Sequence, residues 1–307
     1  MDITAAMVKE LMNLTGAGVM ACKKALQETD GNQEEAIEVL RKKGEATAVK
    51  KAGRIAAEGI VYTAVKDNKA AIVEVNSETD FVAKNDTFQA FVAKVADQIL
   101  AGSATTVDEL LEEKIEGEDK TVKEELTSQI ATIGENMNIR RFEKLESDGV
   151  IVSYIHAGGK IGVLVEADAP KNDAAEEALK NVAMQVAALN AKFLSSDDID
   201  DDYKEHEKAI LLEQIKNDPV ESQKPEKVIN GMIMGRLNKE FKEICLMEQV
   251  YVKAEDGKQS VAKYLEQVSK EIGEDIKVKK FIRFETGEGL EKKEEDFAAE
   301  VASQMAE

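Results

Sequence analysis

Two glycines near the start of the chain form a motif that binds dinucleotides in other proteins. Residues 16–21 read Gly-Ala-Gly-Val-Met-Ala and fit the pattern that brings a pyrophosphate to a helix N-terminus. That chemistry requires an apolar strand before the glycines. Residues 4–14 instead carry apolar side chains, such as Met7 and Leu11, at helical spacing. We therefore interpret the motif as a turn between two helices.

The histidines and cysteines follow no recognisable metal-binding or nucleophile pattern. His156 and His206 are far apart in the chain, and neither has ligands at a metal-binding spacing. Cys22 and Cys245 fall in apolar, helical surroundings, which disfavour a reactive thiolate. We predict no metal site, no bound cofactor and no bond chemistry, so the protein is not expected to be an enzyme. The cysteines are expected to be reduced thiols of a cytoplasmic protein.

Residues 76–85, Asn-Ser-Glu-Thr-Asp-Phe-Val-Ala-Lys-Asn, lie between a β-branched run and an amphipathic helix. One interpretation makes Asp80 or Asn85 a helix cap and Phe81 a plug of the core. The other makes Asp80 and Phe81 an exposed recognition tip. Composition alone favours the first interpretation and leaves the second open.

The elements around these residues begin with three short helices. Thr4 can cap the first, and the turn at residues 30–32 ends the second. Gly44 stands where a C-terminal cap of the third is expected. Residues 45–58 are predicted to be a helical or flexible connector with basic character. A bundle this small is expected to present an apolar face to a partner.

A hairpin followed by a helix occurs twice along the chain. The two copies occupy residues 61–75 with 88–99, and residues 151–166 with 174–189. Aligning Tyr62 with Tyr154 also aligns Glu74 with Glu166. We predict an α+β fold whose core contains two repeated ββα units with antiparallel sheets. Acidic helices at 105–134 and a strand at 138–146 would join them.

The last third of the chain contains an inserted helical hairpin. Residues 195–198 can cap its first helix, Pro219 stops that helix, and a return helix carries apolar residues to Ile244. Charged outer faces and a proline-containing tip are typical of a protruding antiparallel coiled-coil arm. A helix near 260–272 and a strand at 277–284 follow. We expect an N-terminal domain with linker at residues 1–54 and two core subdomains at 55–145 and 146–284. A coiled-coil insertion at about 197–247 lies within the second subdomain, and a C-terminal module or tail occupies 285–307.

The charge of the chain excludes two classes of partner. With 61 Asp and Glu against 41 Lys and Arg, the net charge is −20, which repels nucleic acid and anionic membrane surfaces. No apolar run approaches the roughly 18 residues of a membrane span. We predict direct binding neither to nucleic acid nor to a membrane.

Several motifs in the same order resemble the bacterial elongation factor Ts family. They are the runs at residues 14–26, 79–85, 156–165 and 287–291. The likeness extends over essentially the whole chain. It implies a ubiquitin-associated-like three-helix N-domain, a duplicated core, a coiled-coil arm and a C-terminal module.

The resemblance implies a guanine-nucleotide exchange factor that binds elongation factor Tu carrying GDP. In that family the Asp and Phe of the second motif enter the GTPase near its magnesium ion and phosphates. Asp80 and Phe81 inherit that role, flanked by Thr79 and Val82. The other partner-binding residues implied by the resemblance are Val19, Met20, His156, Gly158 and Gly159.

One residue departs from the family pattern, because position 19 is Val where the family often carries Met. The shorter side chain is expected to weaken that contact without removing it. A dimer of heterodimers with elongation factor Tu is one expected assembly. The alternative function is a scaffold or chaperone-like interaction protein that binds partners without accelerating nucleotide release.

Overall fold

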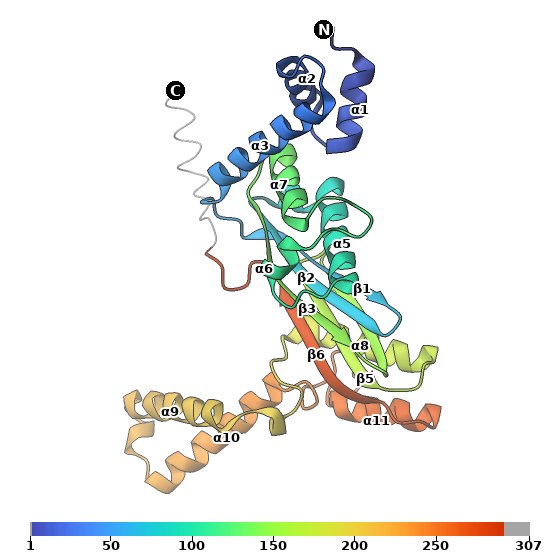
Figure 1. Cartoon of the computed structure of the whole chain (residues 1–307). Helices are drawn as coiled ribbons and strands as arrows, with labels where there is room; N and C mark the ends of the chain where they lie inside the picture. Colours follow the sequence, from blue (N-terminus) through green and yellow to red (C-terminus); the bar gives the residue numbers. More distant parts are fainter. Residues whose placement is uncertain (1, 292–307) are drawn as a thin grey trace.

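The computed structural model describes residues 2–291, which form an elongated molecule with helices at both ends and two sheets between them (Figure 1). The first helical unit comprises α1 (Ala5–Thr15), α2 (Val19–Glu28) and α3 (Gln33–Lys51). Leu11, Cys22 and Leu26 are buried in its small core. Gly16 ends α1 with a left-handed φ of 70°, and Gly18 precedes α2. The glycine motif is therefore a turn between helices, as predicted.

The prediction that Gly44 ends the third helix is wrong. Helix α3 continues to Lys51 and includes the first half of the predicted connector. Gly44 is buried where α3 packs on α7 (Val122–Ile133), beside Thr127 and Ala131. The tertiary contact and the good helix formers that follow Gly44 outweigh the low helix propensity of a single glycine.

Two antiparallel sheets of three strands each form the middle of the molecule. Their strands, in spatial order, are β1 (Glu58–Lys66), β2 (Lys69–Ser77) and β3 (Met137–Glu146) in one sheet, and β4 (Val150–His156), β5 (Ile161–Asp168) and β6 (Lys277–Glu285) in the other. The α+β class and the antiparallel pairing are as predicted. The predicted ββα unit is incomplete, because a third strand from later in the chain joins each hairpin.

The two sheets repeat one another in detail along their central strands. The pairing shifts by one residue after Glu74 in the first sheet and after Glu166 in the second. The alignment of Tyr62 with Tyr154 is wrong by two residues, since Tyr62 faces Val73 whereas Tyr154 faces Val163. The reason is the turn, which spans two residues in the first hairpin and four in the second.

Each sheet is covered by helices on one face and packs near the other sheet with its opposite face. The helices that follow the two hairpins are α5 (Asp86–Ala101) and α8 (Asp173–Leu189). Phe88 and Val92 of α5 and Leu179 and Val182 of α8 are fully buried. A third cluster, which includes Val61, joins strands of the two sheets. The short α6 (Val107–Glu112) precedes α7 on the first sheet.

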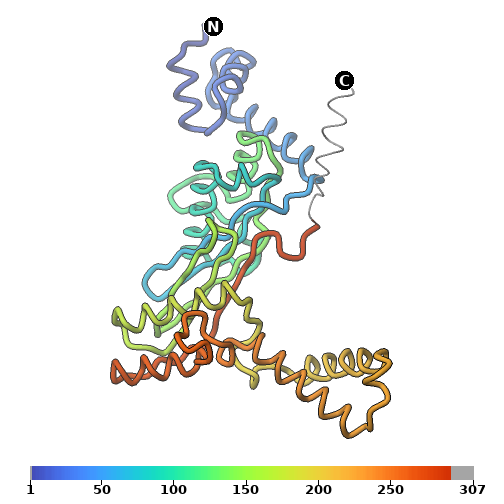
Figure 2. Tube along the Cα trace, turned by 180° about the vertical axis from the view of Figure 1, so that it is seen from behind, coloured from blue at the N-terminus to red at the C-terminus, as the bar shows by residue number. Residues whose placement is uncertain are grey.

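A helical hairpin projects sideways from the far end of the molecule (Figures 1 and 2). Its helices are α9 (Asp201–Asn217) and α10 (Glu226–Ile244), with short 3-10 turns at Ser196–Asp198 and Glu221–Gln223. Ile215 and Leu237 are buried between the two helices. Residues 195–198 cap the first 3-10 turn, and Asp200 caps α9 by accepting a hydrogen bond from the Tyr203 N–H. The predicted helix start is thus a few residues too early.

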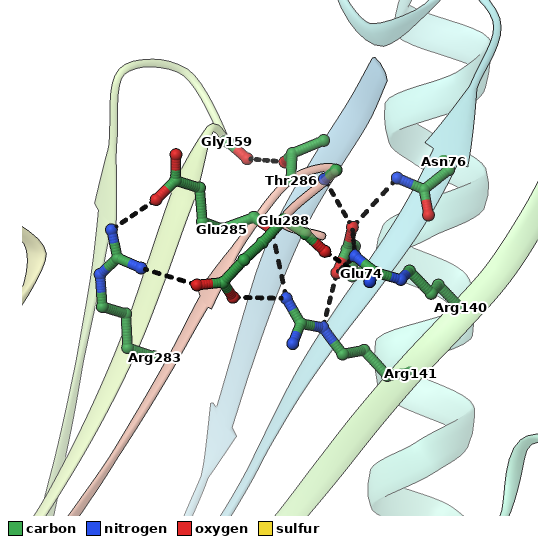
Figure 3. Close-up of polar contacts among 10 residues, drawn as sticks. Glu74, Asn76, Arg140, Arg141, Gly159, Arg283, Glu285, Thr286 and Glu288 are labelled. Carbon is green, nitrogen blue, oxygen red and sulfur yellow. Dashed lines mark hydrogen bonds and ion pairs between the residues drawn. The ribbon is translucent and has the colours of Figure 1, made fainter. Parts of the chain in front are cut away.

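The last described segment follows α11 (Val261–Ile272) and β6 and returns to the first sheet. Buried Glu74 accepts the Gly287 N–H at 2.8 Å and pairs with Arg140 and Arg141 (Figure 3). Most of the predicted C-terminal tail lies outside the described residues. Within the described part of the chain, no helix is long and apolar enough to cross a membrane.

Candidate partner-binding site

The segment at residues 76–85 begins as the buried end of β2 and then forms a single helical turn on the surface. Helix α4 (Asp80–Ala83) begins after Thr79, whose hydroxyl oxygen accepts the Val82 N–H at 3.3 Å. Asn85 caps the next helix, α5. Asn85 is therefore a cap, as one interpretation of the sequence expected, whereas Asp80 is the first residue of α4 and Thr79 caps it.

Phe81 points away from the core. Its side chain is 80% exposed, while Val82 is half-buried and packs against the core of the first sheet. The interpretation of Phe81 as a core plug is therefore wrong. In the free protein most of this phenyl ring is in contact with water. It can therefore bury a large apolar surface against a partner.

Asp80 is held beside two lysines. The Lys84 ammonium donates to the Asp80 carboxylate at 2.6 Å, one helical turn further along. This hydrogen bond, with the charges of Lys84 and Lys160, lowers the pKa of Asp80. The Asp80 carboxylate is therefore ionised at neutral pH. Its side chain is also partly exposed. The sequence motif included Lys84, but only the structure indicates Lys160 as a neighbour.

The second predicted patch, around the turn at residues 157–160, packs on the first sheet. Gly159 has a φ of 98°, and its carbonyl accepts the Val61 N–H at 2.7 Å. A Cβ at Gly159 would lie 2.8 Å from Ile60, so this glycine also has a packing role. His156 is exposed, and its Nδ1 lies 3.0 Å from the Tyr154 hydroxyl.

The third predicted patch lies on the N-terminal unit. Val19 and Met20 begin α2 and are 54% and 65% exposed. The carbonyls of Thr15 and Gly16, just before them, accept hydrogen bonds from hydroxyls of α7. Helix α7 therefore connects this patch to the first sheet, which carries α4.

Burial limits the reactivity of both cysteine thiols. Both cysteines are buried, and burial raises the pKa of Cys22. Burial, together with the nearby Glu248 and Asp198 carboxylates, raises the pKa of Cys245 to about 11. Among residues 2–291, no group of three His, Cys, Asp or Glu side chains is arranged to hold a metal ion.

Sequence reasoning missed Glu135, in the turn after α7. Its carboxylate accepts the Thr79 hydroxyl at 2.7 Å and the N–H groups of Glu78 and Thr79, each at 3.1 Å. No local signal could have indicated this contact, because Glu135 is 56 residues from Thr79 in the chain.

Phe81, Val19 and Met20 are exposed apolar side chains, which are typical of a surface that binds another protein. A model of the family described as Elongation factor TS matches residues 78–288. Elongation factor Ts of Clostridium perfringens is 53% identical over 304 residues, covering 98% of both chains. Elongation factor Ts of Clostridium botulinum strain Eklund 17B is 52% identical over 307 residues, covering 99% of both. The chain belongs to the elongation factor Ts family.

Proposed function

We infer that this chain is a guanine-nucleotide exchange factor of translation elongation and that it acts on elongation factor Tu. Family membership over almost the whole chain supports the role, and the family name supports the partner. The observation that carries the mechanism is the exposure of Phe81 on the single turn of α4, beside the ionised Asp80. The chain needs no cofactor of its own, because it acts on the Mg²⁺ and GDP held by its partner.

Exchange requires coupling between two binding events on the GTPase. If the factor weakens GDP binding by some ratio, GDP must weaken binding of the factor by the same ratio. Contacts with the factor must therefore stabilise a GTPase conformation that holds GDP poorly. A phenyl ring inserted into an apolar pocket can contribute about 2 kcal/mol or more to such a complex.

Asp80 adds an electrostatic contribution at the same place. Mg²⁺ requires nearly octahedral oxygen coordination, so an anion arriving beside it disturbs its water and ligand shell. Loss of Mg²⁺ leaves the diphosphate charge less well neutralised, and GDP dissociates faster. Thr79 and Val82 support this action by holding α4 in place.

The remaining contacts are assigned by family resemblance. Val19 and Met20 would bind the nucleotide-binding domain of the GTPase, and His156, Gly158 and Gly159 another part of it. We propose a ubiquitin-associated-like N-domain with linker at residues 1–54 and core subdomains at 55–145 and 146–284. Helices α9 and α10 form the coiled-coil arm inserted at about 197–247, and residues 285–307 form the C-terminal module or tail. A dimer of heterodimers is the proposed larger assembly.

Release of fluorescent GDP from elongation factor Tu tests this mechanism. Phe81→Ala and Asp80→Ala should each slow release catalysed by this protein by about tenfold or more. Val252→Ala is the matched control, because Val252 is an exposed residue on the loop between α10 and α11. Wild-type exchange by both Phe81→Ala and Asp80→Ala would contradict the mechanism.

The alternative, a scaffold or chaperone-like protein, is separated by the amount of protein required. An exchange factor accelerates release when it is present in catalytic amounts, since each molecule acts on many GTPase molecules. A scaffold binds the loaded GTPase without changing the rate. A release rate independent of added protein would favour the scaffold.

A further inference from the structure

Helix α4 is too short to fix its own orientation. It has four residues, and a single helical turn is unfavourable in isolation because several dihedral angles are fixed for one hydrogen bond. The direction of Phe81 therefore depends on how the base of α4, at Glu78 and Thr79, is held. A partner that bound a mobile Phe81 would lose affinity to the entropy of ordering it.

The carboxylate of Glu135 holds this base. Both of its oxygens are used: one accepts the Thr79 hydroxyl, and the other accepts the N–H groups of Glu78 and Thr79. Hydrogen bonds to a carboxylate are stronger than those between neutral groups. One side chain thus satisfies two consecutive backbone donors that precede α4 and orients the hydroxyl that caps it.

A reciprocal set of hydrogen bonds holds Glu135 in place. The Asn136 N–H donates to the Glu78 carboxylate at 2.5 Å, and the Asn136 side-chain amide donates to the Arg54 carbonyl at 2.8 Å. The Arg54 guanidinium pairs with Glu78 at 3.4 Å. These hydrogen bonds and the ion pair therefore join three segments in a closed network: residues 78–79 before α4, residues 135–136 after α7, and Arg54 after α3.

Helix α7 extends the same support to the N-terminal patch. Ser128 donates to the Thr15 carbonyl at 3.2 Å, and Thr132 donates to the Gly16 carbonyl at 3.4 Å. Helix α7 also packs on α3, where Gly44 lies beside Thr127. One helix thus contacts the loop before Val19 and, through the turn at its end, the base of α4.

We propose that Glu135 is a positioning residue for nucleotide exchange, which orients Phe81 and Asp80 from the end of α7. The inference rests on the proposed function, because its consequence is a rate of GDP release. Glu135 acts through Thr79 and Glu78, and it sets the direction in which α4 presents its side chains. Helix α7 is the frame that links this element to the N-terminal patch.

A second glutamate provides a matched control for a purely structural role. Glu113 accepts the N–H groups of Ser103 and Ala104, each at 2.8 Å, and the Gln98 side-chain amide at 2.9 Å. It therefore makes the same kinds of hydrogen bond to a loop outside the proposed partner-binding patches. Glu135→Ala and Glu113→Ala should lower the urea midpoint of unfolding to a similar extent.

The rate of fluorescent-GDP release from elongation factor Tu then separates the two glutamates. With both variants folded, Glu135→Ala should catalyse GDP release about tenfold more slowly than wild type. Glu113→Ala should catalyse release at the wild-type rate. If Glu135→Ala does not fold, Glu135→Gln replaces it. This variant keeps one acceptor oxygen and should give a smaller loss of rate. Wild-type exchange by the folded Glu135 variant, or equal slowing by Glu113→Ala, would overturn the proposal.

A double-mutant cycle shows whether Glu135 acts through Phe81. In a Phe81→Ala background, Glu135→Ala should slow release by less than the roughly tenfold expected in the wild-type background, because one of the two side chains that it positions is gone. Full additivity would overturn the proposal. If Phe81→Ala is slow and Glu135→Ala is not, only the positioning role fails. If Phe81→Ala exchanges at the wild-type rate, the proposed function of Phe81 fails instead.

Discussion

The buried carboxylate of Glu74 connects residues from three distant parts of the chain. It pairs with Arg140 at 3.0 Å and Arg141 at 2.6 Å, and it accepts the Gly287 N–H and the Asn76 amide (Figure 3). All these partners are hydrogen-bond donors, so the carboxylate is well compensated despite its complete burial. It fixes the end of β6 to the first sheet.

Replacing Glu74 by Gln should destabilise the protein by about 2–3 kcal/mol, because two arginines and a buried N–H lose their anionic partner. The arginines remain partly exposed, which limits the loss. Urea unfolding gives the free energy. Glu143→Gln is the control, since Glu143 forms an exposed pair with Lys280 and should cost less than about 1 kcal/mol. Equal losses in the two variants would contradict the role of Glu74.

The same residue predicts a dependence of stability on pH. Burial raises the pKa of Glu74, but hydrogen bonds from Gly287, Asn76 and the two arginines outweigh burial and lower the pKa below its ordinary value. The unfolded chain therefore takes up this proton at a higher pH than the folded protein. The stabilisation is fully present above the unfolded pKa of about 4.3 and is lost as pH falls through the folded pKa. The stability gap between wild type and Glu74→Gln should narrow below about pH 4.3 and stay constant from pH 6 to 8.

Helices α3 and α7 form the main contact between the N-terminal unit and the rest of the molecule. The sequence indicated α3 but not its length. Glycine commonly ends a helix, so Gly44 was predicted to be the end of α3. In the structure Gly44 is buried in mid-helix at the contact with α7. The contact with α7 has room for a small side chain at this position, and the backbone freedom of glycine is not used there.

Gly44→Ala should raise stability by about 0.5–1 kcal/mol. A Cβ at this position would lie 3.6 Å from Thr127 and 3.7 Å from Ala131, which is ordinary contact, and Ala is the better helix former. Gly44→Leu should lower stability, because the larger side chain separates α3 from α7. Thermal unfolding of both variants provides the measurement. Destabilisation by Gly44→Ala would contradict the expectation that a methyl group fits between α3 and α7.

The two sheets of the core share an apolar cluster, in addition to the polar contacts made by Gly159 and Glu74. Val61, Leu164 and Ile282 are among the buried side chains that they share. Gly162 of β5 lies directly against Val61 of β1, where a Cβ would be 2.4 Å from a methyl group of Val61. Close approach of the two halves of the core therefore requires glycine at this position.

Gly162→Ala should destabilise the protein by about 1–3 kcal/mol, since Val61 is buried and its branched side chain cannot rotate away freely. Gly231→Ala on α10 is the control, because a Cβ there meets no neighbour within 4 Å and should be neutral or stabilising. Chemical unfolding of the two variants tests this. A neutral Gly162→Ala would mean that the sheets can move apart at little cost.

Local signals in the sequence were enough to predict most of the elements and to select the residues of α4. Periodicity and capping residues such as Asn85 predicted most helices and strands, because these signals act between neighbours in the chain. Three other features depend on tertiary packing: the exposure of Phe81, the continuation of α3 past Gly44, and the hydrogen bond from Thr79 to Glu135. Burial and long-range hydrogen bonds depend on which distant segments pack together, and local propensity carries no information about that choice.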